Sequence, residues 1–308
     1  MTRWTTADIP DQTGRTVLIT GANSGLGLRS AEALAAAGGR VLLACRNATR
    51  AAKAHAEVAA VATGPAPEVV SLDVSDLDDV RRCAGQLAGD LEHLDVLMNN
   101  AGVMAVPLAR TPQGFEMQMG TNHLGHFALT ARLLPLLQRA PAPRVVTVSS
   151  FGHKAGRIRW DDPNWNTGRY LAWPAYFQTK LANLLFTGEL HRRATEAGSG
   201  VLAAAAHPGY AATNLSTTGP GSRNAFMHRA AGMTDRLLGQ SDEMGALPQL
   251  YAATMPDVSG NDYWGPDGFL EQRGHPTKVG RTRRAADPGA ARRLWALSEE
   301  LTGVTFTW

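Results

Sequence analysis

The sequence predicts an α/β fold in which helices cover both faces of a doubly wound parallel sheet. Short runs of β-branched and apolar residues alternate with Ala- and Leu-rich segments of helical periodicity. Each run is apolar nearly throughout, which is typical of strands buried on both faces. Neither an internal repeat nor a linker interrupts the 308 residues, so we expect one domain spanning 1–308.

Six runs are expected to form the strands. In chain order they are Thr16–Thr20, Arg40–Cys45, Glu68–Asp73, Leu94–Asn99, Arg144–Ser149 and Val201–Ala206. Helical patterns lie between them, near 25–38, 47–62, 76–90, 113–139 and 174–198. Alternation of this kind is typical of parallel strands joined by right-handed crossovers.

Two segments break the alternation. Phe151–Trp173 contains three tryptophans among Gly, Asp, Asn and Arg residues, and Leu215–Gly239 is rich in Gly, Ser and Thr. Irregular loops of this length inside one domain are usually functional or disordered. Because both follow strands of an open parallel sheet, we expect them at the edge formed by the carboxyl ends of the strands, where ligands bind.

Composition excludes several classes of protein. Hydrophobic residues make up 44% and charged residues 19%, with a net charge of +3, as in a globular domain. The surplus arginines occur late without a nucleic-acid-binding motif, so no nucleic-acid partner is expected. No apolar run reaches 18 residues, which predicts no integral membrane association. Two cysteines without metal-like spacing favour a reducing, cytoplasmic location.

A glycine-rich loop separates the first strand from the first helix. Its sequence, Thr20-Gly-Ala-Asn-Ser-Gly-Leu-Gly27, permits a tight turn and a close backbone approach, and the helix that follows offers free N–H groups to a phosphate. The glycine spacing differs from the common dinucleotide fingerprint. We nevertheless predict a dinucleotide phosphate site here, with contacts from Gly21, Asn23, Ser24, Gly25, Leu26 and Gly27.

The end of the second strand indicates which dinucleotide binds. An acidic residue there would bind a ribose 2′-hydroxyl and favour NAD, but the residues are Ala44, Cys45, Arg46 and Asn47. The guanidinium of Arg46 is suited to a 2′-phosphate. The sequence therefore favours NADP over NAD, although Arg46 could also be an ordinary surface residue.

Tyr176 and Lys180 lie four residues apart on the predicted helix that begins near Pro174. Residues at this spacing share a helix face, so the pair could be catalytic or an ordinary surface pair. A tyrosine with its usual pKa near 10 is a poor base at neutral pH. A nearby ammonium favours the phenolate, so we expect Lys180 to lower the pKa of Tyr176.

Five motifs in order resemble the short-chain dehydrogenase/reductase family, and the resemblance spans Thr16 to Thr213. They are Thr20–Gly27, Asn99–Gly102, Ser149-Ser150, Tyr176 with Lys180, and His207–Gly209. Asn122–Phe127, Tyr176–Phe186 and the 26 positions from Ser150 to Tyr176 are similar to the retinol dehydrogenase branch. Members of that branch commonly carry an N-terminal membrane anchor, and none is expected here.

The resemblance implies a single-domain Rossmann fold and four catalytic residues. Tyr176 would be the general acid in reduction and the general base in oxidation. Lys180 would also hold the nicotinamide ribose, and Ser150 would orient the substrate oxygen. Asn122 would position a water for proton relay. A cofactor-binding part is expected at about 14–150 and a catalytic and substrate part at about 150–308.

The resemblance also implies further cofactor contacts. Asp73 and Val74 would hold the adenine, although Asp73 could instead cap a helix, a role for which Ser75 competes. Beyond these and Arg46, the cofactor contacts are expected from Asn100, Ala101, Gly102, Tyr176, Lys180, Pro208, Gly209 and Thr213. His207 is expected to be structural. His123, His126 and His153 lack metal-like spacing, so no metal site is predicted.

We expect an NADP-dependent oxidoreductase that interconverts a carbonyl and an alcohol on a lipophilic small molecule. The two irregular segments could wall an apolar pocket or merely pack onto the body; the candidate residues are Met104, Val106, Phe151, Trp173, Tyr210, Phe226 and Met227. A carbon–carbon double-bond reductase and a catalytically silent sensor or scaffold are the alternatives. The family often dimerises through the helices here expected near 113–139 and 174–198.

Overall fold

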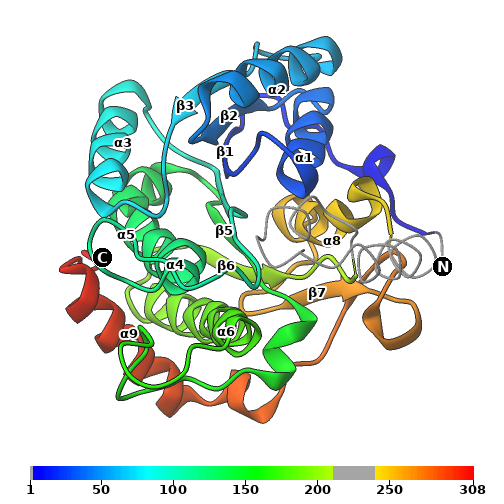
Figure 1. Ribbon diagram of the computed structural model, residues 1–308. Helices are drawn as coiled ribbons and strands as arrows, with labels where there is room; N and C mark the ends of the chain where they lie inside the picture. Colours follow the sequence, from blue (N-terminus) through cyan, green and yellow to red (C-terminus); the bar gives the residue numbers. More distant parts are fainter. Residues whose placement is uncertain (1–2, 211–239) are drawn as a thin grey trace.

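An eight-stranded sheet runs through the centre of the computed structural model, which describes residues 3–210 and 240–308 (Figure 1). The strand order is β3-β2-β1-β4-β5-β6-β7-β8, and every pairing is parallel except that of β7 with β8. The strands are β1 (Thr16–Thr20), β2 (Arg40–Cys45), β3 (Glu68–Ser71), β4 (Val96–Asn99), β5 (Arg144–Val148), β6 (Leu202–Ala206), β7 (Tyr263–Pro266) and β8 (Pro276–Lys278).

Helices cover both faces of this sheet. They are α1 (Gly25–Ala36), α2 (Ala48–Val61), α3 (Leu77–Asp90), α4 (Met117–Met119), α5 (Gly125–Arg139), α6 (Ala172–Glu196), α8 (Asp242–Thr254) and α9 (Pro288–Thr302). Shorter turns are η1 (Thr6–Asp8), the π-helical η2 (Gly120–Leu124), η3 (Phe151–Ala155), η5 (Phe269–Glu271) and η6 (Arg283–Ala286). One core cluster joins α1, α2 and α8 to the sheet, and another joins α3, α5, α6 and α9. The predicted doubly wound Rossmann fold is therefore confirmed.

Local sequence signals set several helix boundaries. The side chain of Asn47 accepts the N–H of Arg50 at the start of α2, and Asp76 accepts the N–H of Asp78 at the start of α3. Helix α9 begins with the Asp287 cap followed by Pro288, and it ends at Gly303 in the left-handed conformation. The cap of α3 is therefore Asp76, and neither Asp73 nor Ser75 has this role.

Strand β3 corrects one prediction. It pairs with β2 alone, at the edge of the sheet, and Val69 is 45% exposed. The expectation that every strand is buried on both faces is wrong here, because an apolar run does not reveal a strand's place in the sheet.

The sequence reading did not predict the elements after residue 240. Strand β7 contains Gly265 and Pro266, and β8 begins with Pro276, residues that weaken a strand pattern and are tolerated near a sheet edge. Helix α8 contains Pro248. Among the described helices, none combines the length and apolar character needed to cross a bilayer.

Candidate active site

The glycine loop has a geometry that only glycine allows. Gly21 and Gly25 adopt left-handed φ angles of 68° and 53°. A Cβ on Gly27 would lie 2.5 Å from the carbonyl oxygen of Gly21 and 2.6 Å from Nδ2 of Asn100. Asn23, Ser24 and Leu26 belong to this turn, with Ser24 at the N-cap of α1. The loop and the helix N-terminus therefore form a backbone cradle that fits a dinucleotide phosphate.

The segment after β4 joins this cradle to the predicted catalytic residues. Oγ1 of Thr20 lies 2.9 Å from the N–H groups of both Asn100 and Ala101 and accepts from them. A Cβ on Gly102 would lie 3.2 Å from Oδ1 of Asn122 and 3.8 Å from Nζ of Lys180. Asn100–Gly102 thus runs between the two groups of residues.

Asn122 lies on the π-helical turn η2, a feature that often marks functional sites. Its Oδ1 accepts the N–H of Val103 at 2.8 Å, and its Nδ2 donates to the carbonyl of Val103 at 2.9 Å and to Oγ1 of Thr179 at 3.0 Å. The fully buried side chain therefore ties η2 to the strand β4 extension and to α6.

Tyr176 and Lys180 share a buried face of α6. Nζ of Lys180 lies 5.6 Å from the centre of the Tyr176 ring and donates to the carbonyl of Val148 at 3.1 Å. Burial lowers the pKa of Lys180 to about 8. Burial also raises the pKa of Tyr176 to about 12, against the opposing effect of a hydrogen bond with Ser150. The expected net lowering of the pKa of Tyr176 is therefore not found, because desolvation by burial outweighs the effects that favour the phenolate.

The two serines after β5 make different contacts. Oγ of Ser149 donates to the carbonyl of Lys180 at 2.8 Å. Oγ of Ser150 accepts the N–H of Gly152 at 3.1 Å, and its hydroxyl is within hydrogen-bonding reach of Tyr176. The second serine is consequently the one beside the tyrosine.

Arg46 and Asp73 meet at the ends of β2 and β3. Nη1 of Arg46 lies 3.2 Å from Oδ2 of Asp73, and the arginine side chain is 69% exposed. The other carboxylate oxygen of Asp73 accepts from the backbone and hydroxyl of Ser75. Val74 is buried with its carbonyl against Gly125. The exposed guanidinium remains accessible to a ligand at this end of the sheet.

Pro208 and Gly209 follow β6, and Gly209 has a left-handed φ of 68°. A Cβ on Gly209 would lie 2.4 Å from the carbonyl oxygen of Gln272, so the residue packs tightly on the β7–β8 connection. Three predicted site residues, Thr213, Phe226 and Met227, lie outside the described residues.

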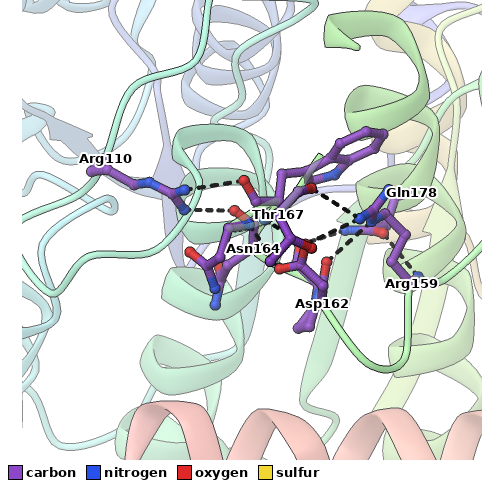
Figure 2. Close-up of polar contacts among 9 residues, drawn as sticks. Arg110, Arg159, Asp162, Asn164, Thr167 and Gln178 are labelled. Atoms are coloured by element: carbon purple, nitrogen blue, oxygen red, sulfur yellow. Dashed lines mark hydrogen bonds and ion pairs between the residues drawn. The ribbon is translucent and has the colours of Figure 1, made fainter. Parts of the chain in front are cut away.

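The long segment between Ser150 and Tyr176 is held by polar contacts (Figure 2). The carboxylate of Asp162 accepts from the backbone of Asn166 and Thr167 and pairs with Arg159 at 3.0 Å. Gln178 of α6 donates to Pro163, and Arg110 donates to the carbonyl of Asn164 at 2.5 Å. The segment is therefore fixed to α6 and to the loop after β4.

The three tryptophans of this segment have different surroundings. Trp160 lies under the guanidinium of Arg293, and Trp165 lies under that of Arg159. Trp160 therefore packs the segment onto α9, as one of the two interpretations expected, whereas the contact between Trp165 and Arg159 lies within the segment. Trp173 is half exposed, with its ring 6.1 Å from that of Tyr176. Of the three, Trp173 is the one that is both exposed and next to Tyr176.

Comparison with known proteins identifies the family. A sequence profile of the family described as short chain dehydrogenase matches residues 15–220. Retinol dehydrogenase 13 of Homo sapiens is 40% identical over 294 residues, which cover 94% of this chain and 85% of that protein. The chain belongs to the short-chain dehydrogenase family. Retinol dehydrogenase 14 of Mus musculus is 38% identical over 307 residues, covering 94% of this chain and 86% of its own length.

Solved structures resemble this short-chain dehydrogenase as well. An uncharacterized protein from Mycobacterium paratuberculosis has a TM-score of 0.83 and 47% identity, and the match covers 100% of both chains. A proposed NAD(P)-dependent gluconate 5-dehydrogenase from Beutenbergia cavernae, with NADP bound at low occupancy, has a TM-score of 0.58 and 27% identity over 79% of this chain and 90% of its own.

Family membership confirms the predicted class of reaction. This short-chain dehydrogenase, similar to retinol dehydrogenases, is an oxidoreductase that acts on CH–OH groups of a small molecule and interconverts alcohol and carbonyl. The nicotinamide cofactor is NAD(P).

Two polar side chains of this dehydrogenase site were missed. His126 places Nε2 2.9 Å from Oγ1 of Thr20 and Nδ1 3.3 Å from the carbonyl of Asn122. Gln249 of α8 donates to Oδ1 of Asn100 at 3.2 Å. The four-residue spacing from Asn122 to His126 was a usable signal, whereas Gln249 is too distant in sequence to carry one.

Proposed function

We propose that this dehydrogenase uses NADP to interconvert a carbonyl and an alcohol on a lipophilic molecule, with Tyr176 as the general acid/base. The observation that carries the proposal is that four predicted catalytic side chains come together in the fold. The hydroxyls of Ser150 and Tyr176, the ammonium of Lys180 and the amide of Asn122 come from three segments, and Asn100–Gly102 connects Asn122 and Lys180 to the glycine cradle. The division into a cofactor part at about 14–150 and a catalytic part at about 150–308 belongs to this proposal.

The chemistry follows from protonation states. With its pKa near 12, Tyr176 is protonated at neutral pH and can donate its proton to a developing alkoxide. Ser150 would hydrogen-bond the same oxygen and orient the carbonyl. NADPH, when bound, supplies the hydride. Lys180 would hold the ribose of that cofactor, and its cation would stabilise negative charge on Tyr176 in the alcohol-oxidising direction.

The preference for NADP is supported by charge. Arg46 is exposed at the end of β2, where a carboxylate would select NAD. Its pairing with Asp73 would yield to a 2′-phosphate, because a surface ion pair contributes only about 0–1 kcal/mol. The Beutenbergia cavernae relative binds NADP. Cys45 and Cys83 are free and buried, which fits a cytoplasmic location.

A lipophilic substrate is supported by exposed apolar side chains on the segments that follow β4, β5 and β6. Leu171 and Trp173 at the start of α6, Leu108 after β4 and Tyr210 after β6 are each 44–52% exposed. These positions all follow carboxyl ends of strands, where ligands bind in such sheets. The names of the retinol dehydrogenase relatives indicate an apolar alcohol in those proteins.

Cofactor titration tests the proposal first. NADPH and NADH are titrated by fluorescence into the wild type, into Arg46→Asp and into Arg40→Asp. Arg40 is the matched control, since it pairs with Glu68 at the opposite end of the same strand. We expect Arg46→Asp to weaken NADPH binding by about tenfold or more, the effect of losing a charged hydrogen bond, with little change for NADH. Equal NADH and NADPH binding by the wild type would contradict the NADP preference.

Product analysis then distinguishes the chemistries. An α,β-unsaturated apolar aldehyde is supplied with NADPH, and the products are separated as the unsaturated alcohol or the saturated aldehyde. We expect the unsaturated alcohol from the wild type and a loss of about 10²- to 10⁴-fold in Tyr176→Phe. The saturated aldehyde would favour double-bond reduction, and equal rates in Tyr176→Phe would refute the role of the tyrosine.

A further inference from the structure

A buried histidine holds the segment predicted to approach the nicotinamide. The side chain of His207 is fully buried, and its Nδ1 accepts the N–H of Gly209 at 3.2 Å. Burial lowers the pKa of His207, which favours the neutral ring. A neutral imidazole that accepts at Nδ1 carries its proton on Nε2. The Nε2–H group therefore needs an acceptor inside the protein.

Glu271 offers a carboxylate to this group. Its Oε2 lies 3.2 Å from Nε2 of His207, an ion-pair distance at which the two atoms lack hydrogen-bond geometry, whereas its Oε1 accepts from Nζ of Lys154 at 3.0 Å. Both partners lower the pKa of Glu271, to about 2, so the carboxylate is ionised. Lys154 lies on η3, four residues after Ser150. One carboxylate thus connects the segment after β5 with the segment after β6.

The backbone around Glu271 indicates that this placement is constrained. Leu270 and Glu271 have φ angles of 52° and 57°, a left-handed conformation that costs residues with side chains about 1–3 kcal/mol each. Such conformations persist where tertiary contacts enforce them, and they cluster at functional sites.

Hydrogen bonds to neighbouring segments hold the backbone around Glu271 in this left-handed conformation. Tyr210 donates its N–H to the carbonyl of Gln272 at 2.7 Å. Gln240 donates to the carbonyl of Pro208 and accepts the N–H of Gly274. The β7–β8 connection, residues 267–275, is therefore a support built against His207–Tyr210.

We propose that Glu271 is a positioning residue: it fixes the Nε2–H tautomer of His207 and, through Lys154, holds the Pro208–Gly209 segment in register with Ser150. This inference rests on the proposed function, in which Pro208 and Gly209 approach the nicotinamide and Ser150 binds the substrate oxygen. Glu271 itself does not touch the reacting atoms. His153 and Tyr263 also contact the segment at Ser150. Nδ1 of His153 lies 2.8 Å from the carbonyl oxygen of Ser150 and 3.5 Å from the hydroxyl of Tyr263.

Histidine NMR tests the first half of the proposal without any need for turnover. Long-range ¹⁵N–¹H spectra of the ¹⁵N-histidine-labelled protein report each ring's tautomer, and the His207 signal is identified by its loss in His207→Gln. We expect the Nε2–H tautomer in the wild type and in Glu271→Gln, whose amide oxygen can still accept. In Glu271→Ala we expect a mixture of tautomers. An Nδ1–H tautomer in the wild type, or an unchanged His207 signal in Glu271→Ala, would overturn the proposal.

Kinetics test the second half. We expect Glu271→Ala to lower kcat/KM with NADPH by about 10- to 100-fold, a range typical of residues that orient another ligand-binding group. The kcat/KM values of Glu271→Gln and of Lys154→Met should lie between those of Glu271→Ala and the wild type. Glu68→Ala, which removes an exposed paired carboxylate elsewhere, is the control. Melting curves show whether each variant is folded, and wild-type kcat/KM in folded Glu271→Ala would refute the role.

The two proposals fail separately. If the wild type neither binds nor oxidises NADPH, the proposed function fails, and the NMR result still decides whether Glu271 fixes His207. If the wild type is active while Glu271→Ala matches it, only the positioning role fails.

Discussion

Lys180 is an ammonium group held almost out of water. The residue is 5% exposed, and burial lowers its pKa to about 8 from the usual value near 10.4. Between these two values the unfolded chain binds more protons than the folded one, so stability increases with pH across this window and is lowest below it. Burying the positive charge of Lys180 therefore lowers the stability of the folded protein at neutral pH.

We therefore expect Lys180→Met to raise the melting temperature at pH 7 and to abolish carbonyl reduction. Methionine fills the space without a charge, and the carbonyl of Val148 still accepts from Nδ2 of Asn183 at 3.0 Å. Melting curves at pH 7 and pH 10 measure the effect, which should shrink at the higher pH. Lys53→Met, at a position 81% exposed, is the control. A lower melting temperature for Lys180→Met at pH 7 would contradict the argument.

The side chains that meet at the candidate site could be named from the sequence, and the direction of their pKa shifts could not. The family's motifs are short and occur in a fixed order along the chain. A resemblance to them was therefore enough to name Asn122, Ser150, Tyr176 and Lys180. The direction of the pKa shift of Tyr176 could not be predicted, because it depends on how completely the folded protein buries this face of α6. Glu271 lies far from Ser150 in sequence, so no spacing rule connects them.

At the scale of elements, the turn from β1 into α1 depends on Gly27. A Cβ there would meet the backbone carbonyl of Gly21 at 2.5 Å, and a backbone group in a tight turn cannot move aside as a side chain can. We expect Gly27→Ala to destabilise the fold by about 1–3 kcal/mol, as overpacking does, and to weaken NADPH binding by tenfold or more.

A second glycine provides the control for that measurement. A Cβ on Gly85 of α3 would have nothing within 4 Å, so Gly85→Ala should stabilise the protein by about 0.5–1 kcal/mol through helix propensity alone. Urea unfolding and NADPH titration of both variants give the comparison. If both alanines stabilise the protein and leave NADPH binding unchanged, the close approach at Gly27 is not structurally required.

Elements were predictable where burial gives a clear pattern. Strands β1 and β2 match their expected bounds because they lie inside the sheet and are apolar nearly throughout. The exposed strand β3 and the Pro-containing β7 and β8 give weaker signals, because at an edge the strand pattern is set by neighbours that the local sequence does not specify.

At the scale of the whole molecule, the chain covers its own expected dimer face. Helix α9 lies beside α6 (Figure 1), with the Trp295 ring stacked 5.9 Å from Phe186. Phe306 lies 5.1 Å from Phe127 of α5, and Trp308 packs on Phe306. The C-terminal segment thus buries apolar side chains of α5 and α6, the two helices through which a dimer is expected.

This arrangement predicts a monomer, or an assembly that uses another face. Light scattering of the intact chain should give a mass near 32.8 kDa. The double variant Phe306→Ser, Trp308→Ser should uncover apolar surface over Phe127 while leaving α9 in place, so its mass should increase with concentration. Trp4→Ser, an aromatic change that contacts Tyr251 on the opposite face, is the matched control and should leave the mass unchanged. A dimer of the intact chain that disappears when α5 or α6 residues are changed would show that α9 yields to a partner. The covering role of the C-terminal segment would then be refuted.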